Sequence, residues 1–87
     1  MSRIIIDVRE PFEYATGHVK EALNIPPATL MQGVPKQLAD IPKDTELILY
    51  CRSGARSNAS MHILSQYGFT NMVNGINKDH VNAKYAS

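Results

Sequence analysis

The sequence predicts an α/β domain: an open parallel sheet of four strands with helices on both faces. The apolar runs at residues 4–6 and 47–50 lack the polar alternation of half-exposed strands, as expected when a strand is buried on both sides. Segments with helix-start signals or helical spacing separate these runs. This alternation favours parallel strands joined by right-handed helical crossovers.

Eight segments are expected along the chain. The strands cover residues 4–8, 22–25, 47–50 and 70–73, and the helical segments cover residues 11–17, 29–38, 57–67 and 77–85. Pro11 fits the first turn of the first helix, and Gly17 can close it. Two successive prolines end the second strand. The second helical segment is weak, because Gly33 and Pro35 interrupt it and could split it into two short helices.

The second half of the chain holds the clearest helix. A turn over residues 42–45 leads into the third strand. The helix that follows has its inner face at the spacing i, i+3, i+4, i+7, on Ser60, Ile63, Leu64 and Tyr67. Gly68 is a natural stop for this helix. We expect Asn74 and Gly75 to turn the chain after the fourth strand, before a last helix of modest propensity.

The composition describes an ordinary globular protein. Its 87 residues suit one domain over residues 1–87 with a single core. The net charge of +1 gives no reason to expect nucleic acid or a membrane surface as a partner. No apolar run approaches the roughly 18 residues of a membrane span. We expect a monomer in the cytoplasm, or in the periplasm if a signal peptide was removed.

The loop between the third strand and the clearest helix carries the only cysteine. It reads Cys51-Arg52-Ser53-Gly54-Ala55-Arg56-Ser57. Backbone N–H groups at a helix N-terminus hold anions and lower a thiol pKa, and nearby arginines add to this effect. We therefore interpret Cys51 as a nucleophile; the alternative is a buried structural thiol. Gly54 can take a positive φ and, with Ala55, leaves room for a tight cradle.

A single cysteine excludes an internal disulfide and a multi-cysteine zinc site, and we expect neither a metal nor a cofactor. Asp7 and Arg9 end the first strand. If the first and third strands are neighbours, these side chains lie at the ligand-binding edge of the sheet. We favour supporting roles for both, since a buried Asp satisfies loop N–H groups and Arg9 could pair with Glu13.

These features resemble the rhodanese family in four stretches that stand in the expected order. They cover residues 6–14, 17–26, 50–57 and 67–69. The resemblance implies the rhodanese fold, with strands in the spatial order 4-3-1-2. The chain lacks the extra first strand of larger relatives, and residues 73–79 lack their usual paired glycines and tryptophan. It is therefore similar to the compact phage-shock-type bacterial rhodaneses.

The resemblance also implies an activity and a set of site residues. Cys51 corresponds to the cysteine that carries sulfur as a persulfide. The donor would be thiosulfate and the acceptor cyanide or a thiol, with a sulfur-accepting protein as a further candidate partner. The rest of the loop would bind substrate, through Arg52, Ser53, Gly54, Ala55, Arg56 and Ser57. Asp7 and Arg9 would stand beside the loop, and Glu13 and His18 occupy supporting positions.

Two other functions stay open. Cysteine-dependent phosphatases and arsenate reductases, some with this fold, place an arginine six positions after the cysteine. Here that position is Ser57 and the arginine is Arg56, so the loop is one residue shorter and suits a single sulfur atom better than a tetrahedral oxyanion. The second alternative is a non-catalytic sulfur-carrier or binding module. Ordinary structural roles also remain for Arg52 at the rim and for Ser57 as a helix cap.

Overall fold

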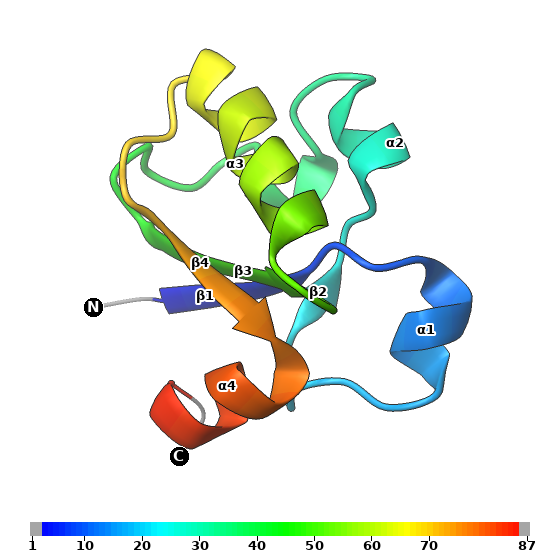
Figure 1. Cartoon of the computed structure of the whole chain (residues 1–87). Coiled ribbons are helices and arrows are strands. Elements are labelled where there is room, and N and C mark those ends of the chain that lie inside the picture. Colours follow the sequence, from blue (N-terminus) through cyan, green and yellow to red (C-terminus); the bar gives the residue numbers. More distant parts are fainter. Residues whose placement is uncertain (1–2, 86–87) are drawn as a thin grey trace.

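The computed structural model describes residues 3–85 and contains a four-stranded parallel sheet between helices (Figure 1). The strands are β1 (Arg3–Asp7), β2 (Leu23–Asn24), β3 (Glu46–Cys51) and β4 (Met72–Asn77). Their spatial order is β2-β1-β3-β4, which confirms the predicted order 4-3-1-2. No helix within these residues is long and apolar enough to cross a membrane.

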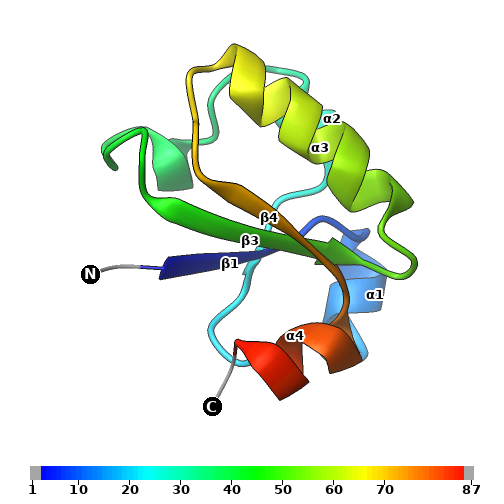
Figure 2. The same ribbon diagram turned by 60° about the vertical axis from the view of Figure 1, so that its left-hand side comes forward.

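Helices cover both faces of the sheet, as predicted. They are α1 (Pro11–Ala15), α2 (Pro27–Leu30), the 3-10 helix η1 (Lys36–Leu38), α3 (Ala55–Gln66) and α4 (Lys78–Lys84). Figures 1 and 2 show α2 and α3 over one face and α4 over the other. The weak helical stretch is split in two, as Gly33 and Pro35 suggested, since α2 and η1 lie on either side of them.

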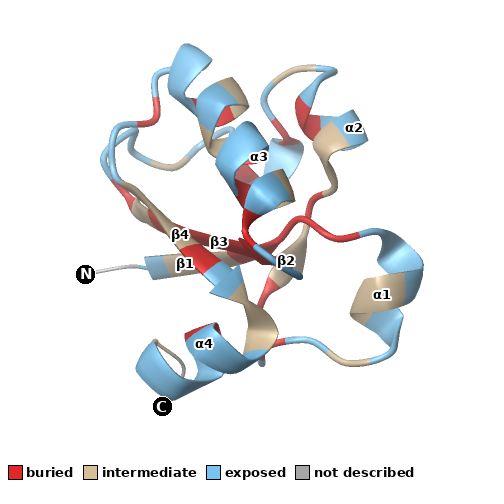
Figure 3. Ribbon diagram, in the orientation of Figure 1, coloured by how far each residue is buried: buried red, intermediate tan, exposed pale blue. Residues whose placement is uncertain are grey.

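The central strand β3 explains why its sequence lacks polar alternation. Leu47, Leu49 and Cys51 pack into the cluster under α2 and α3, whereas Ile48 and Tyr50 pack into the cluster on the α4 side. All five side chains are buried, and the strand lies in the middle of the molecule (Figure 3). Burying each large apolar side chain contributes about 1.5–3 kcal/mol relative to exposure. The strand that carries Cys51 is thus held rigidly on both sides.

The expected turn at Asn74 and Gly75 is wrong, because β4 continues through both residues. Leu49 pairs with Asn74 and Tyr50 pairs with Ile76, so Gly75 is an extra residue in a β-bulge. A Cβ on Gly75 would lie 2.5 Å from Val81 Cγ2 and 3.1 Å from the Leu49 carbonyl oxygen. The glycine is therefore required by close packing of the bulge against α4 and β3 and not by a hairpin turn.

Helix α3 begins earlier than the predicted range, at Ala55. Its N-cap is Gly54, which adopts a left-handed φ of +97°. Ser57 consequently lies inside the first turn and does not cap the helix. The predicted inner face is confirmed, since Ser60 and Leu64 are buried. The early start brings the first turn of α3 directly onto the end of β3.

Candidate active site

The carboxyl edge of the sheet collects the residues singled out in the sequence. Asp7 ends β1 beside Tyr50 of β3, and Cys51 ends β3 beside Asn77 of β4. Figure 1 shows the loop from the tip of β3 rising into α3. The adjacency of the first and third strands, on which the predicted site depended, is therefore present.

The Cys51 thiol is buried under its own loop, with the residue only 2% exposed. The Gly54 backbone N–H donates to Cys51 Sγ at 3.1 Å. Burial raises the pKa of the thiol. The Ser57 hydroxyl and the N–H groups of Ser57, Ser53 and Gly54 outweigh that effect and lower the pKa to about 7. A large fraction of Cys51 is therefore thiolate at neutral pH.

Ser57 is the unsatisfied polar residue of the loop. Its Oγ is buried and makes no hydrogen bond of good geometry to any residue in the 3–85 range. It nevertheless lies close enough to the thiol to lower its pKa. We treat this contact as electrostatic, because the hydrogen-bond geometry is incomplete. A buried hydroxyl of this kind favours an added anionic partner, since leaving it unpaired costs about 1–3 kcal/mol.

The two loop arginines turn toward a carboxylate rather than over the thiol. Arg56 Nη1 donates to Glu13 Oε1 at 2.7 Å, and Arg52 Nη1 lies 4.0 Å from Glu13 Oε2. The Arg56 hydrogen bond holds the pKa of Glu13 at about 2. The arginines were expected to stabilise the thiolate. In the structure, the Ser57 hydroxyl and the backbone N–H groups lower the pKa of the thiol most, and Arg56 adds an electrostatic attraction to the thiolate.

A buried network around Asp7 joins the ends of β1 and β3 to the segment after α1. Arg9 donates to both Asp7 carboxylate oxygens, with Nη2 2.8 Å from Oδ2. Tyr50 Oη donates to the same Oδ2 at 2.8 Å and accepts from the Val19 N–H at 3.0 Å. The expected pairing of Arg9 with Glu13 is wrong, since Asp7 takes Arg9 and leaves Glu13 to Arg56. Asp7 and Arg9 thus lie at the end of β1, one strand away from Cys51, and supporting roles for them stay a prediction.

Asn74 is a site residue that the sequence did not indicate. Its Nδ2 donates to the Gly54 carbonyl at 2.9 Å, and its Oδ1 accepts from the Ile76 N–H at 3.0 Å. The sequence did not indicate this contact, because the Asn-Gly pair predicted a turn.

Two other residues were predicted to occupy supporting positions. Glu13 is one of them, and in the structure it pairs with Arg56. His18 is exposed and stacks on Tyr14, with ring centroids 3.6 Å apart.

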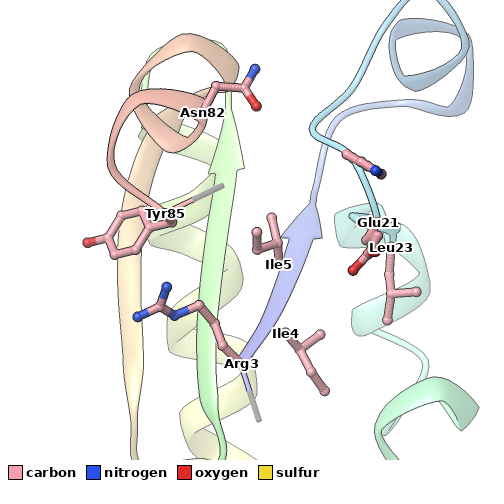
Figure 4. Close-up of a pocket in the computed structure, with 8 residues that line it drawn as sticks. Arg3, Ile4, Ile5, Glu21, Leu23, Asn82 and Tyr85 are labelled. Atoms are coloured by element: carbon pink, nitrogen blue, oxygen red, sulfur yellow. The ribbon is translucent and has the colours of Figure 1, made fainter. Parts of the chain in front are cut away.

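A groove of about 580 Å³ lies at the other end of the strands (Figure 4). Its lining includes Arg3, Ile5, Glu21 and Tyr85, and β1 at this level pairs with the start of β3. It is therefore remote from Cys51, and size alone does not make it the reactive site. Across residues 3–85 no three His, Cys, Asp or Glu side chains gather closely enough to hold a metal ion.

Comparisons with known proteins give relatives in both sequence and fold. A family model described as "Rhodanese-like domain" matches residues 1–78. A sulfurtransferase of Allochromatium vinosum is 38% identical over 71 residues, which cover 82% of this chain and 63% of that protein. The chain thus spans less than two thirds of that relative.

Two solved structures share the fold and part of the sequence. A rhodanese with anions from Escherichia coli is 29% identical, with a TM-score of 0.77 over 91% of each chain. A single-domain sulfurtransferase of Saccharomyces cerevisiae is also 29% identical, with a TM-score of 0.70 over 97% of this chain and 76% of that one. The narrower likeness to phage-shock-type proteins stays a prediction.

Proposed function

Since the chain belongs to the rhodanese-like domain family, we propose that it is a thiosulfate sulfurtransferase that works through a persulfide on Cys51. The observation that carries the proposal is the buried Cys51 thiol with a pKa of about 7, bonded to the Gly54 N–H at the start of α3. A thiolate, and not a thiol, is the attacking form. The sulfurtransferase from Allochromatium vinosum, similar over 82% of this chain, supports the same chemistry.

The first half-reaction forms the persulfide. The Cys51 thiolate attacks the outer sulfur of thiosulfate, and a new S–S bond forms at Sγ. The S–S bond of the donor breaks, and its electron pair leaves with sulfite. The Ser53 and Gly54 N–H groups then face a persulfide anion in place of the thiolate, and the unsatisfied Ser57 hydroxyl is available to it.

The second half-reaction returns the thiolate. A thiophilic acceptor, such as cyanide or a thiolate, attacks the outer sulfur, and the electron pair of the S–S bond returns to Cys51 Sγ. The same N–H groups that stabilised the starting anion receive it again. Both steps therefore proceed within one set of preorganised donors, as efficient electrostatic stabilisation requires.

The position of Arg56 weighs against phosphatase or arsenate chemistry. A loop that binds a tetrahedral oxyanion needs its arginine turned toward the anion. Here both Arg56 Nη atoms donate to Glu13, with Nη2 3.2 Å from Oε2. The backbone donors that remain fit a single sulfur atom on Cys51 better than a four-oxygen group.

Intact-mass measurement after incubation with thiosulfate tests the proposal. We expect wild-type protein to gain the mass of one sulfur atom, dithiothreitol to remove it, and Cys51→Ala to gain nothing. Thiocyanate should form from thiosulfate and cyanide at a rate well above that of Cys51→Ala. A wild type with no added mass and only the rate of the alanine variant would overturn the proposal. A persulfide without turnover would instead indicate a sulfur carrier.

A further inference from the structure

The β4 bulge contacts the Cys51 loop through one side chain. Asn74 lies on β4 opposite Leu49, one residue before the extra Gly75. Its Nδ2 donates to the Gly54 carbonyl at 2.9 Å. An added Cβ on Gly54 would lie 3.4 Å from the Asn74 amide, so the loop and the bulge are in close contact.

Gly54 contacts both the thiol and the β4 bulge. Its N–H donates to Cys51 Sγ. Its carbonyl accepts two hydrogen bonds, one from the Asn74 amide and one from the Asn58 N–H in the first turn of α3. Glycine adopts its φ of +97° without strain, and it can equally well adopt other values of φ. Such a residue needs outside contacts to keep its N–H aimed at the sulfur.

The Asn74 side chain also bonds to the backbone of a strained residue, Ile76. Ile76 has a φ of +73°, a conformation in which a β-branched residue is an outlier. Asn74 Oδ1 accepts the Ile76 N–H at 3.0 Å, a side-chain bond to the backbone two residues on that forms an Asx turn within the β4 bulge and stabilises the φ of Ile76. Strained positions of this type persist only where the surroundings fix them, and they concentrate at functional sites. Here the strained turn places Asn74 so that its amide reaches Gly54.

We propose that Asn74 is a positioning residue for Cys51. It acts through Gly54, whose carbonyl it fixes, and thereby keeps the loop N–H groups directed at the thiolate and at the persulfide. The inference deepens the proposed function and rests on it for the persulfide. The effect on the thiol itself is independent of any sulfur donor.

The two roles of Asn74 can be separated because glycine adopts a positive φ without help. Asn74→Ala removes both contacts. Ile76→Gly removes the strain and keeps the bond to Gly54. The double variant Asn74→Ala/Ile76→Gly also lacks both contacts, but glycine at position 76 takes the positive φ without the Oδ1 bond, so the lost bond to the loop is the change that matters for the thiol. Glu21→Gly is the matched control, since Glu21 has a φ of +69° and lines the groove at the other end of the strands.

The measurement is the pKa of Cys51, taken from the pH dependence of alkylation by iodoacetamide, with thermal unfolding of each variant as a check on the fold. We expect the pKa to rise by about half a unit to one unit in Asn74→Ala and in the double variant, because one support of a thiolate donor is lost. Ile76→Gly and Glu21→Gly should keep the wild-type pKa.

A double variant with the wild-type thiol pKa would overturn the proposal, because Asn74 would then serve only the turn at Ile76. The proposal would also be overturned if Ile76→Gly alone shifted the pKa of Cys51 as far as Asn74→Ala does, because that variant keeps the bond from Asn74 to Gly54. Alkylation needs no thiosulfate. If wild-type protein forms no persulfide, the proposed function fails, and the pKa comparison still decides whether Asn74 positions the thiol.

Discussion

The Glu13 carboxylate binds the Arg56 guanidinium through two hydrogen bonds, with Oε1 2.7 Å from Nη1 and Oε2 3.2 Å from Nη2. This pair joins α1 to the first turn of α3, across residues 43 apart in the chain. It also offsets the positive charge of Arg56 beside the loop. Arg52, with its side chain 76% exposed, lies 4.0 Å from Glu13 Oε2 at the rim of the loop.

Replacing Glu13 should loosen the loop and change its acid sensitivity. We expect Glu13→Gln to lower the free energy of unfolding by about 1 kcal/mol at pH 7, since the bond is charge-assisted while Arg56 stays partly exposed. The folded-state pKa of Glu13, about 2, is below its ordinary value of 4.5. The stabilisation from this carboxylate is therefore present above pH 4.5 and lost as the pH falls toward 2.

Urea unfolding between pH 2 and 7 checks this prediction. Asp40→Asn is the matched control, because Asp40 is an exposed acid with no ion pair among the described residues. The difference between wild type and Glu13→Gln should shrink as the pH falls from 4.5 to 2. A difference that stays constant over this range would contradict the assigned pKa.

The reactivity of Cys51 should follow its thiolate fraction. With a folded-state pKa of about 7, alkylation and sulfur transfer should rise through pH 7 and level off above about pH 8. Ser57→Ala removes the hydroxyl that lowers the pKa, so the midpoint should move upward. Ser60→Ala, one turn further along α3 and bonded to the Arg56 carbonyl, is the control that should leave the midpoint in place. An unchanged midpoint in Ser57→Ala would contradict this role.

The fold was predictable where the sequence pattern is local. The unbroken apolar runs of β1 and β3 indicated buried parallel strands, and the spacing of Ser60 and Leu64 indicated the inner face of α3. The path of β4 was not predictable in this way. Asn-Gly normally indicates a turn, whereas here Gly75 is the extra residue of a β-bulge, and a Cβ on it would overlap Val81 Cγ2 of α4. The approach of Val81 depends on the packing of α4 against the sheet, which no local pattern around Gly75 indicates.

The candidate site was predictable to the same extent. Its contiguous part, from Cys51 to Ser57, could be found in the sequence because strand, loop and helix follow one another. The partners of that loop come from distant segments: Glu13 from α1 and Asn74 from β4. Asp7 and Glu13 both lie near Arg9 in the sequence, and only the structure shows that Arg9 pairs with Asp7.

The buried hydrogen bonds of Asp7 with Arg9 and Tyr50 should contribute strongly to the free energy of unfolding. Asp7→Ala leaves the Arg9 guanidinium buried without its carboxylate, and such a loss costs about 3–5 kcal/mol. Tyr50→Phe keeps the packing and leaves the Val19 N–H without an acceptor, for an expected loss of about 1–3 kcal/mol. Chemical unfolding measures both. A larger loss for Tyr50→Phe than for Asp7→Ala would contradict the central place of Asp7.

The β4 bulge should reject any side chain at Gly75. We expect Gly75→Ala to destabilise the fold by about 1–3 kcal/mol, because the new methyl group overlaps Val81 Cγ2 and crowds the Leu49 carbonyl. Val81→Ala alone should also destabilise, by leaving a cavity on the α4 side of the sheet. The double variant should lose less than the sum of the two, since each change makes room for the other. Additive losses in urea unfolding would show that the overlap with Val81 does not determine the residue at position 75.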